Sequence, residues 1–210
     1  MKIELIDITK KIKNKTVLEN VDMTLETGKI YGLAGENGSG KTMLMRVLSG
    51  LIRPSGGKIK LDDREIHAMD LATVKVGLVL ENTSLYNSMT GFENLMYLGN
   101  LRSDIRQDRV NEMLDKVGLD PTDKRKYSTY SLGMKQKLAI AQAFLEYPNL
   151  LLLDEPTNAI DEESCKKIRK LIMEGREERI TLLVSHDRSV IDDLCDIIYT
   201  IADGKVRLCQ

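Results

Sequence analysis

The residues best suited to chemistry form one run, residues 35–42, which read GENGSGKT. This run fits the phosphate-binding pattern G-x-x-x-x-G-K-[ST] at every position. Its glycines let the backbone bend tightly and turn N–H groups toward an anion, because no Cβ blocks the required dihedrals. Lys41 can reach the β- and γ-phosphates of a nucleotide, and the Thr42 hydroxyl can bind Mg²⁺. The predicted phosphate-binding residues are Gly35, Glu36, Asn37, Gly38, Ser39, Gly40, Lys41 and Thr42.

The residues on both sides of this run supply the elements that must position it. Residues 29–34 predict a strand, and apolar residues recur at helical spacing over residues 43–51. The loop therefore lies between a strand and a helix N-terminus, where the helix dipole and unpaired N–H groups favour an anion. A glycine-rich turn with a chance lysine is the alternative, and the flanking elements argue against it.

Two carboxylates follow a second apolar run. Residues 150–153 are four leucines, which predict a central parallel strand that is buried on both faces. Asp154 and Glu155 fall at the carboxyl end of this strand, where ligands bind in open α/β sheets. We expect Asp154 to hold Mg²⁺ through water, and Glu155 to orient or deprotonate the water that attacks the γ-phosphate. Alone, the pattern would indicate only a strand and an acidic turn.

Of the two histidines, only His186 has a position in the sequence that indicates a role in the site. His186 ends a predicted buried strand at residues 181–186, so we expect it at the same sheet edge. There it could donate a hydrogen bond to a γ-phosphate oxygen, although a lone histidine is more often structural. His67 has no such context and is predicted to lie on the surface.

Composition narrows the class of protein. The chain has 210 residues, of which 42% are apolar and 30% charged, and its net charge is −1. These values are typical of a soluble globular protein with one domain, or one domain with an inserted lobe. Nothing in the charge indicates a nucleic-acid partner, and no apolar run is long enough to span a membrane. The three cysteines lack the spacing of a disulfide framework or zinc site and fit a reducing cytosol.

The patterning along the chain predicts an α/β fold. Two strands, at residues 3–8 and 17–25, flank a lysine-rich turn, and residues 76–80 predict a buried strand. Helical periodicity extends over residues 90–147, with Ser131 as a plausible N-cap of the last helix. We therefore expect a P-loop NTPase core with a mainly parallel central sheet and an N-terminal antiparallel β subdomain. One domain would span residues 1–210, with a helical subdomain inserted at about residues 82–148.

A short segment before the acidic strand gives the chain its family resemblance. Residues 130–136, YSLGMKQ, resemble the signature Leu-Ser-Gly-Gly-Gln of ATP-binding cassette (ABC) transporters. The phosphate loop, signature, acidic strand and His186 follow one another in the order of that family. The chain therefore resembles, over essentially its whole length, the nucleotide-binding subunit of an ABC transporter.

This resemblance implies partners and cofactors. In the family, Ser131 and the N–H groups of Gly133 and Met134 would bind the γ-phosphate of ATP held by the opposite protomer. The implied cofactors are ATP and Mg²⁺, and the implied activity is ATP hydrolysis. The implied partners are a second copy or a homologous ATPase, and a separate membrane permease that holds the subunit at the inner face of the cell membrane.

Three single positions depart from the family pattern, and residues 158–161, NAID, replace its common Ser-Ala-Leu-Asp turn. Ile12 stands where an aromatic residue usually stacks on adenine, so we expect weaker or less selective base binding. Glu81 stands where a glutamine usually touches Mg²⁺ or the attacking water, and Leu132 replaces the first signature glycine. Residues 81–86 and 89–95 are similar to bacterial subunits that export bacitracin or lantibiotic peptides.

The predicted function is thus to power a bacterial exporter of a peptide, antibiotic or similar small molecule. The alternative is a soluble cassette ATPase that serves a cytosolic assembly, such as an iron–sulphur scaffold. A ribosome-acting cassette protein would carry two cassettes in one chain, and a P-loop switch protein would lack the signature and the helical insert.

Overall fold

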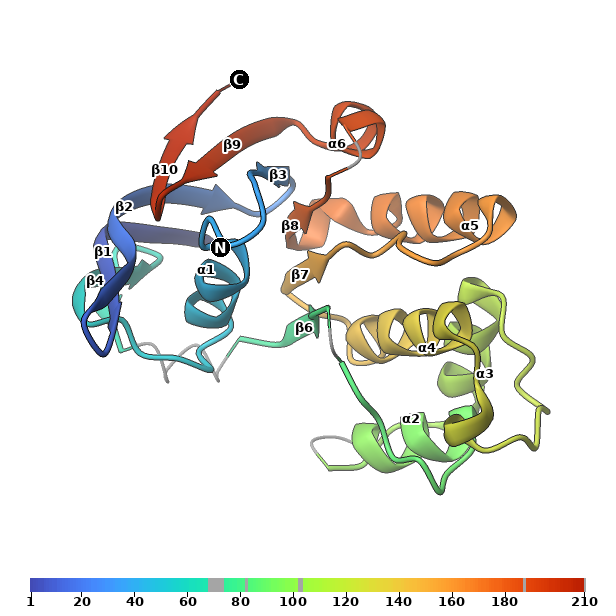
Figure 1. The fold of residues 1–210 in the computed structure, drawn as a ribbon. Helices are drawn as coiled ribbons and strands as arrows, with labels where there is room; N and C mark the ends of the chain where they lie inside the picture. Colours follow the sequence, from blue (N-terminus) through green and yellow to red (C-terminus); the bar gives the residue numbers. More distant parts are fainter. Residues whose placement is uncertain (68–73, 82, 102–103, 187, 210) are drawn as a thin grey trace. The chain divides into compact units, whose positions relative to one another are not determined.

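The computed structural model describes residues 1–210 except 68–73, 82, 102–103, 187 and 210 (Figure 1). The chain forms two compact units. The first unit consists of residues 1–76, 149–154 and 175–210, and the second of residues 77–148 and 155–174.

An antiparallel sheet opens the first unit. Its strand order is β2-β1-β4-β5. The strands are β1 (Lys2–Ile12), β2 (Lys15–Glu26), β4 (Gly56–Leu61) and β5 (Arg64–Ile66). The β1–β2 hairpin is longer than the sequence predicts, because Ile12 still pairs with Lys15 and only Lys13 and Asn14 form the turn. The lysine-rich segment is therefore mostly strand.

A mainly parallel sheet carries the strands that precede the predicted site residues. Its order is β10-β9-β3-β8-β7-β6, in which β3 is parallel to both β8 and β9, and β7 is parallel to β8. The strands are β3 (Ile30–Ala34), β6 (Val76–Val79), β7 (Leu150–Asp154), β8 (Ile180–Val184), β9 (Ile197–Ala202) and β10 (Lys205–Leu208). The predicted α/β fold with its N-terminal antiparallel sheet is confirmed.

Burial along these strands follows their place in the sheet. Every residue of β7 and β8 is buried, as the sequence predicts for parallel strands covered on both faces. In β6 only alternate residues are buried, so the prediction of a fully buried strand there is wrong. The reason is position, because β6 is the edge strand of the sheet order.

The helices are divided between the two units. The first unit has α1 (Lys41–Leu48) and α6 (Arg188–Leu194), and the second has α2 (Gly91–Gly99), α3 (Gln107–Val117), α4 (Leu132–Phe144) and α5 (Glu162–Met173). Tyr127–Thr129 and Arg176–Glu178 form 3₁₀ turns. A capping box starts α2, where the Thr90 hydroxyl accepts from the Glu93 N–H and the Glu93 carboxylate accepts from the Thr90 N–H.

The second unit is larger than the predicted insert. It contains residues 82–148 but also residues 155–174, which include α5. A salt bridge of 2.7 Å joins Lys116 of α3 to Glu174, directly after α5. Sequence order alone does not reveal that α5 packs with the inserted helices.

Two findings bear on the compositional predictions. Among the described residues, no helix is both long and apolar enough to cross a membrane. Cys165, Cys195 and Cys209 are all free thiols, as predicted.

Candidate functional site

The phosphate loop lies between β3 and α1 in the first unit, as the sequence predicts (Figure 1). Gly40 is the N-cap of α1 and has φ of 117°, a conformation that residues with a Cβ rarely adopt. A Cβ at Gly40 would also lie 3.0 Å from the Val17 carbonyl oxygen of β2. The site therefore needs glycine both for its backbone angle and for the close approach of β2.

Lys41 folds back over the loop that precedes it. Its ammonium donates to the carbonyl oxygens of Gly35, at 2.7 Å, and Glu36, at 2.9 Å. An ammonium has three donors, so these bonds do not exhaust it. The buried Ser39 hydroxyl oxygen has no hydrogen-bond partner among the described residues. Such a group can bond to a ligand oxygen, so the loop fits an anion.

Thr42 and Asp154 meet although they lie far apart in the sequence. The Thr42 hydroxyl donates to a carboxylate oxygen of Asp154 at 3.1 Å, and Asp154 is only 4% exposed. Both groups belong to the first unit. Two oxygens at this spacing, one of them charged, are ligands that Mg²⁺ prefers. The donor chemistry therefore fits the predicted magnesium site.

His186 borders the start of the phosphate loop. It is exposed and follows β8 by two residues. A cavity of about 540 Å³ is lined by Gly35, Glu36 and His186 together with residues of α6, β9 and the C-terminal segment. The structure thus brings the histidine and the first loop residues to one cavity. Cys209 also lines it, which no pattern in the sequence indicates.

Ile12 lies at the end of β1 and is 43% exposed. Its hairpin passes the phosphate loop at Val17, through the close approach to Gly40 described above. An exposed aliphatic side chain on such a hairpin offers an apolar surface but no π-face.

The signature residues stand at the start of α4 in the second unit. Ser131 is the N-cap, and its hydroxyl accepts from the Met134 N–H at 3.2 Å, as predicted. Leu132 is 72% exposed, whereas Gly133 packs so tightly that a Cβ there would lie 2.5 Å from the Ala159 carbonyl oxygen. The helix therefore presents its N-terminus to solvent, with an exposed leucine beside it.

Glu155 and Glu81 also belong to the second unit. Glu155 follows β7 directly and has φ of 49°. Glu81 is exposed on a turn after β6, which the Thr83 hydroxyl closes by donating to the Leu80 carbonyl at 2.9 Å. The predicted site residues are thus distributed over both units.

Sequence reasoning gave no role to Gln136 and Lys137, although both contact the segment after Glu155. Gln136 donates to the Glu155 carbonyl at 3.2 Å, and Lys137 pairs with Asp161 at 2.9 Å. The pKa of Asp161 lies below its ordinary value, and the hydrogen bond from Lys137 is the largest cause. The only signal in the sequence is that Gln136 ends the quoted signature.

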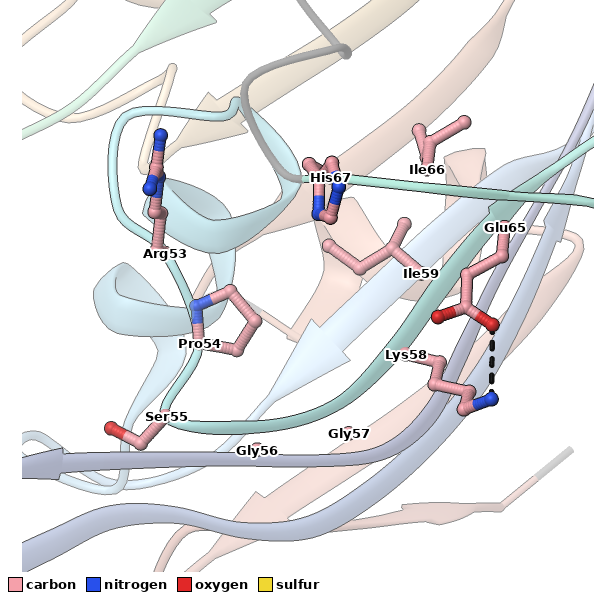
Figure 2. Close-up of a pocket in the computed structure, with 10 residues that line it drawn as sticks. All are labelled: Arg53, Pro54, Ser55, Gly56, Gly57, Lys58, Ile59, Glu65, Ile66 and His67. Atoms are coloured by element: carbon pink, nitrogen blue, oxygen red, sulfur yellow. Dashed lines mark ion pairs between the residues drawn. The ribbon is translucent and has the colours of Figure 1, made fainter.

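A second cavity is lined by none of the predicted site residues. It has a volume of about 430 Å³ and lies between the loop after α1 and strands β4 and β5 (Figure 2). Arg53 and Pro54 lie on one side, and Lys58 and Glu65 lie on the other, joined by an ion pair of 3.0 Å. The pairing offsets the lysine charge, so the cavity is not strongly cationic.

The fold and the first unit's site define a class of protein. A phosphate loop between a parallel strand and a helix, with a buried aspartate against its threonine, is the arrangement of a P-loop nucleotide hydrolase. The model of the ABC transporter family matches residues 18–158. The chain therefore belongs to the ABC transporter family and is an ATP-hydrolysing cassette.

Relatives of this chain include ATP-binding proteins of transport systems. The ABC transporter ATP-binding protein YybJ of Bacillus subtilis is 42% identical over 99% of this chain and 96% of its own length. The lantibiotic transport ATP-binding protein SrtF of Streptococcus pyogenes is 36% identical over 96% of this chain and 87% of its own. The bacitracin transport ATP-binding protein BcrA of Enterococcus faecalis is 36% identical over 97% of this chain and 67% of its own.

Solved structures share the fold. The chain matches the dimeric structure of MJ0796, a bacterial ABC transporter cassette, with a TM-score of 0.89 and 26% identity. The match covers 99% of this chain and 98% of that one. A dimeric post-hydrolysis state of MJ0796 bound to ADP and phosphate matches equally well, at 24% identity.

Proposed function

We propose that this chain is the ATP-hydrolysing subunit of an exporter and drives a separate membrane permease. The observation that carries the hydrolytic part is the contact of 3.1 Å between Thr42 and Asp154, beside the lysine of the phosphate loop. The similarity to the lantibiotic transport protein SrtF and the bacitracin transport protein BcrA supports a peptide or antibiotic as the class of transported molecule.

The phosphate loop would hold ATP through its backbone N–H groups and Lys41. The ammonium would exchange its bonds to the Gly35 and Glu36 carbonyls for bonds to the β- and γ-phosphates. Ile12 would cover the base without stacking on it, so the site should accept GTP as well as ATP.

Thr42 and Asp154 would hold Mg²⁺, with Glu81 as a further oxygen ligand. The ion, when bound, offsets part of the phosphate charge. Glu155 would accept a proton from the attacking water, and His186 would donate a hydrogen bond to a γ-phosphate oxygen.

A second cassette would complete each site. The N-terminus of α4, with Ser131, Gly133 and Met134, would bind the γ-phosphate held by the partner, because a helix N-terminus favours an anion. The dimeric structures of MJ0796 support such an assembly. The second cassette is either another copy of this chain or a homologous ATPase.

A resistance assay tests the exporter proposal. A strain that lacks this chain should become more sensitive to bacitracin or to a lantibiotic, because export protects the cell. Wild-type chain should restore resistance, whereas Glu155→Gln should not, since an amide cannot accept the proton.

Membrane fractionation of the same strains tests the localisation. The wild-type chain should sediment with membranes through its permease. Unchanged sensitivity to both compounds, together with a chain found only in the cytosolic fraction, would favour the alternative of a cytosolic assembly.

A further inference from the structure

The backbone of Glu155 is held in an uncommon conformation. Its φ of 49° lies in the left-handed region, which residues other than glycine rarely adopt. Such a conformation persists only where surrounding contacts fix it, and it occurs often at functional sites. The contacts of the Glu155 backbone therefore indicate what holds it in this conformation.

Among the described residues, a backbone N–H and a side-chain amide both donate to the Glu155 carbonyl oxygen. The Asn158 N–H donates to it at 3.2 Å and closes the local turn. The second donor, Nε2 of Gln136, lies 3.2 Å away and comes from α4, 19 residues earlier in the chain. Rotation of the Glu155 backbone out of the left-handed region would swing the carbonyl away from Gln136.

The first turns of α4 contact the same segment at two further points. Lys137 forms a salt bridge of 2.9 Å with Asp161, and the lysine side chain is only 12% exposed. The backbone of Gly133 lies against the Ala159 carbonyl, which leaves no space for a Cβ. All of these residues belong to the second unit. The start of α4 and residues 155–161 therefore form one packed block.

We propose that Gln136 is a positioning residue for hydrolysis: its hydrogen bond to the Glu155 carbonyl fixes the backbone that aims the catalytic carboxylate. This inference rests on the proposed role of Glu155. The inference also assigns α4 two roles. The helix that begins at Ser131 then carries both the predicted anion site and the group that orients Glu155. Occupation of that anion site would steady the first turns of α4 and, through Gln136, the carboxylate of the same chain.

The test compares donors and non-donors at one position. Gln136→Glu has nearly the same shape but no donor at pH 7.5, and Gln136→Met also removes the donor. Both should lower kcat by about tenfold, the effect of one lost hydrogen bond. KM for ATP should stay unchanged, because the phosphate loop is untouched. Gln136→Lys keeps a donor of similar reach and should recover most of the rate.

Gln142→Glu is the matched control, since it makes the same chemical change on the same helix. It should leave kcat and the melting temperature at wild-type values. Equal losses at both positions would indicate a general effect on α4 and overturn the proposal. Wild-type kcat in Gln136→Glu and Gln136→Met would also overturn it.

The Glu155→Gln background separates this inference from the function on which it rests. Adding Gln136→Glu there should cause no further loss of rate and should leave the ATP-dependent dimer intact. A further loss, or loss of the dimer, would show that Gln136 acts through another group. If Glu155→Gln alone hydrolyses ATP at the wild-type rate, the proposed catalytic role of Glu155 is wrong, and the inference about Gln136 is overturned with it.

Discussion

The carbonyl oxygens of Gly35 and Glu36 occupy the positions at the Lys41 ammonium that phosphate oxygens would take. The ammonium bonds to two carbonyl oxygens of its own loop, so the loop is folded around a positive charge before any nucleotide arrives. Hydrogen bonds to charged groups contribute about 1.5–3 kcal/mol each. The free energy of nucleotide binding should therefore depend strongly on this one side chain.

We expect Lys41→Ala to weaken ATP binding by at least about tenfold, the effect of about 1.4 kcal/mol. Titration with a fluorescent ATP analogue measures this change. Lys58→Ala is the control, because Lys58 pairs with Glu65 at the second cavity (Figure 2). This variant should bind the analogue with wild-type affinity. Wild-type affinity in Lys41→Ala would contradict the assignment of the loop.

The three thiols should differ in reactivity. Burial raises the pKa of Cys195 to about 12, so its reactive thiolate is scarce at ordinary pH. Burial also raises the pKa of Cys165, whereas Cys209 is exposed. At pH 8, iodoacetamide should therefore alkylate Cys209 first and leave Cys195 unmodified in the folded protein.

Peptide mass spectrometry over a time course measures this order. The raised pKa also means that folded Cys195 keeps its proton above the usual thiol pKa of about 8.5, where the unfolded chain loses it. The contribution of Cys195 to folding stability is therefore complete below about pH 8.5 and declines as the pH rises further. Early alkylation of Cys195 would contradict its burial.

At the scale of elements, α4 shows how one glycine fixes a contact. Gly133 lies in the first turn of α4, and a Cβ there would point at the Ala159 carbonyl oxygen. The neighbouring Leu132 faces solvent, so the helix tolerates a large side chain at one position and no Cβ at the next. The packing against residues 155–161, rather than the helix itself, requires this glycine.

Gly133→Ala should therefore destabilise the fold, although alanine favours helix. Overpacking of this kind costs about 1–3 kcal/mol. Gly56→Ala is the control, because a Cβ there meets only Thr9 at 4.0 Å, an ordinary contact. Urea denaturation of both variants gives their free energies of unfolding. Equal values for Gly133→Ala and wild type would show that residues 155–161 move away from α4 at little cost.

At the scale of the whole molecule, we propose that each site is shared between two cassettes. The exposed N-terminus of α4 is then an interface element whose ligand is held by the partner. Assembly should depend on ATP and should be stable only while hydrolysis is blocked.

Glu155→Gln with ATP and Mg²⁺ should elute from a size-exclusion column as a dimer, whereas wild type should remain largely monomeric. Ser131→Arg in the Glu155→Gln background should prevent the dimer, because a bulky side chain fills the predicted phosphate position. A shift that also occurs without nucleotide would indicate another interface.

The sequence by itself determined the chemical groups and the local structure around them. The phosphate loop, the buried strand before Asp154 and the N-cap at Ser131 all follow from short-range patterns, because burial periodicity and capping are encoded within a few residues. The order of the motifs was enough to indicate the family.

Only the tertiary structure decided which distant groups meet. Thr42 and Asp154 are 112 residues apart. They touch because β3, which precedes the phosphate loop, and β7, which ends at Asp154, share one sheet whose order no local pattern specifies. For the same reason β6 is half-buried, since an apolar run does not reveal whether its strand lies at an edge. The bond from Gln136 to Glu155 depends on how α4 packs against a turn from another part of the chain, and apolar periodicity carries no information about that polar contact.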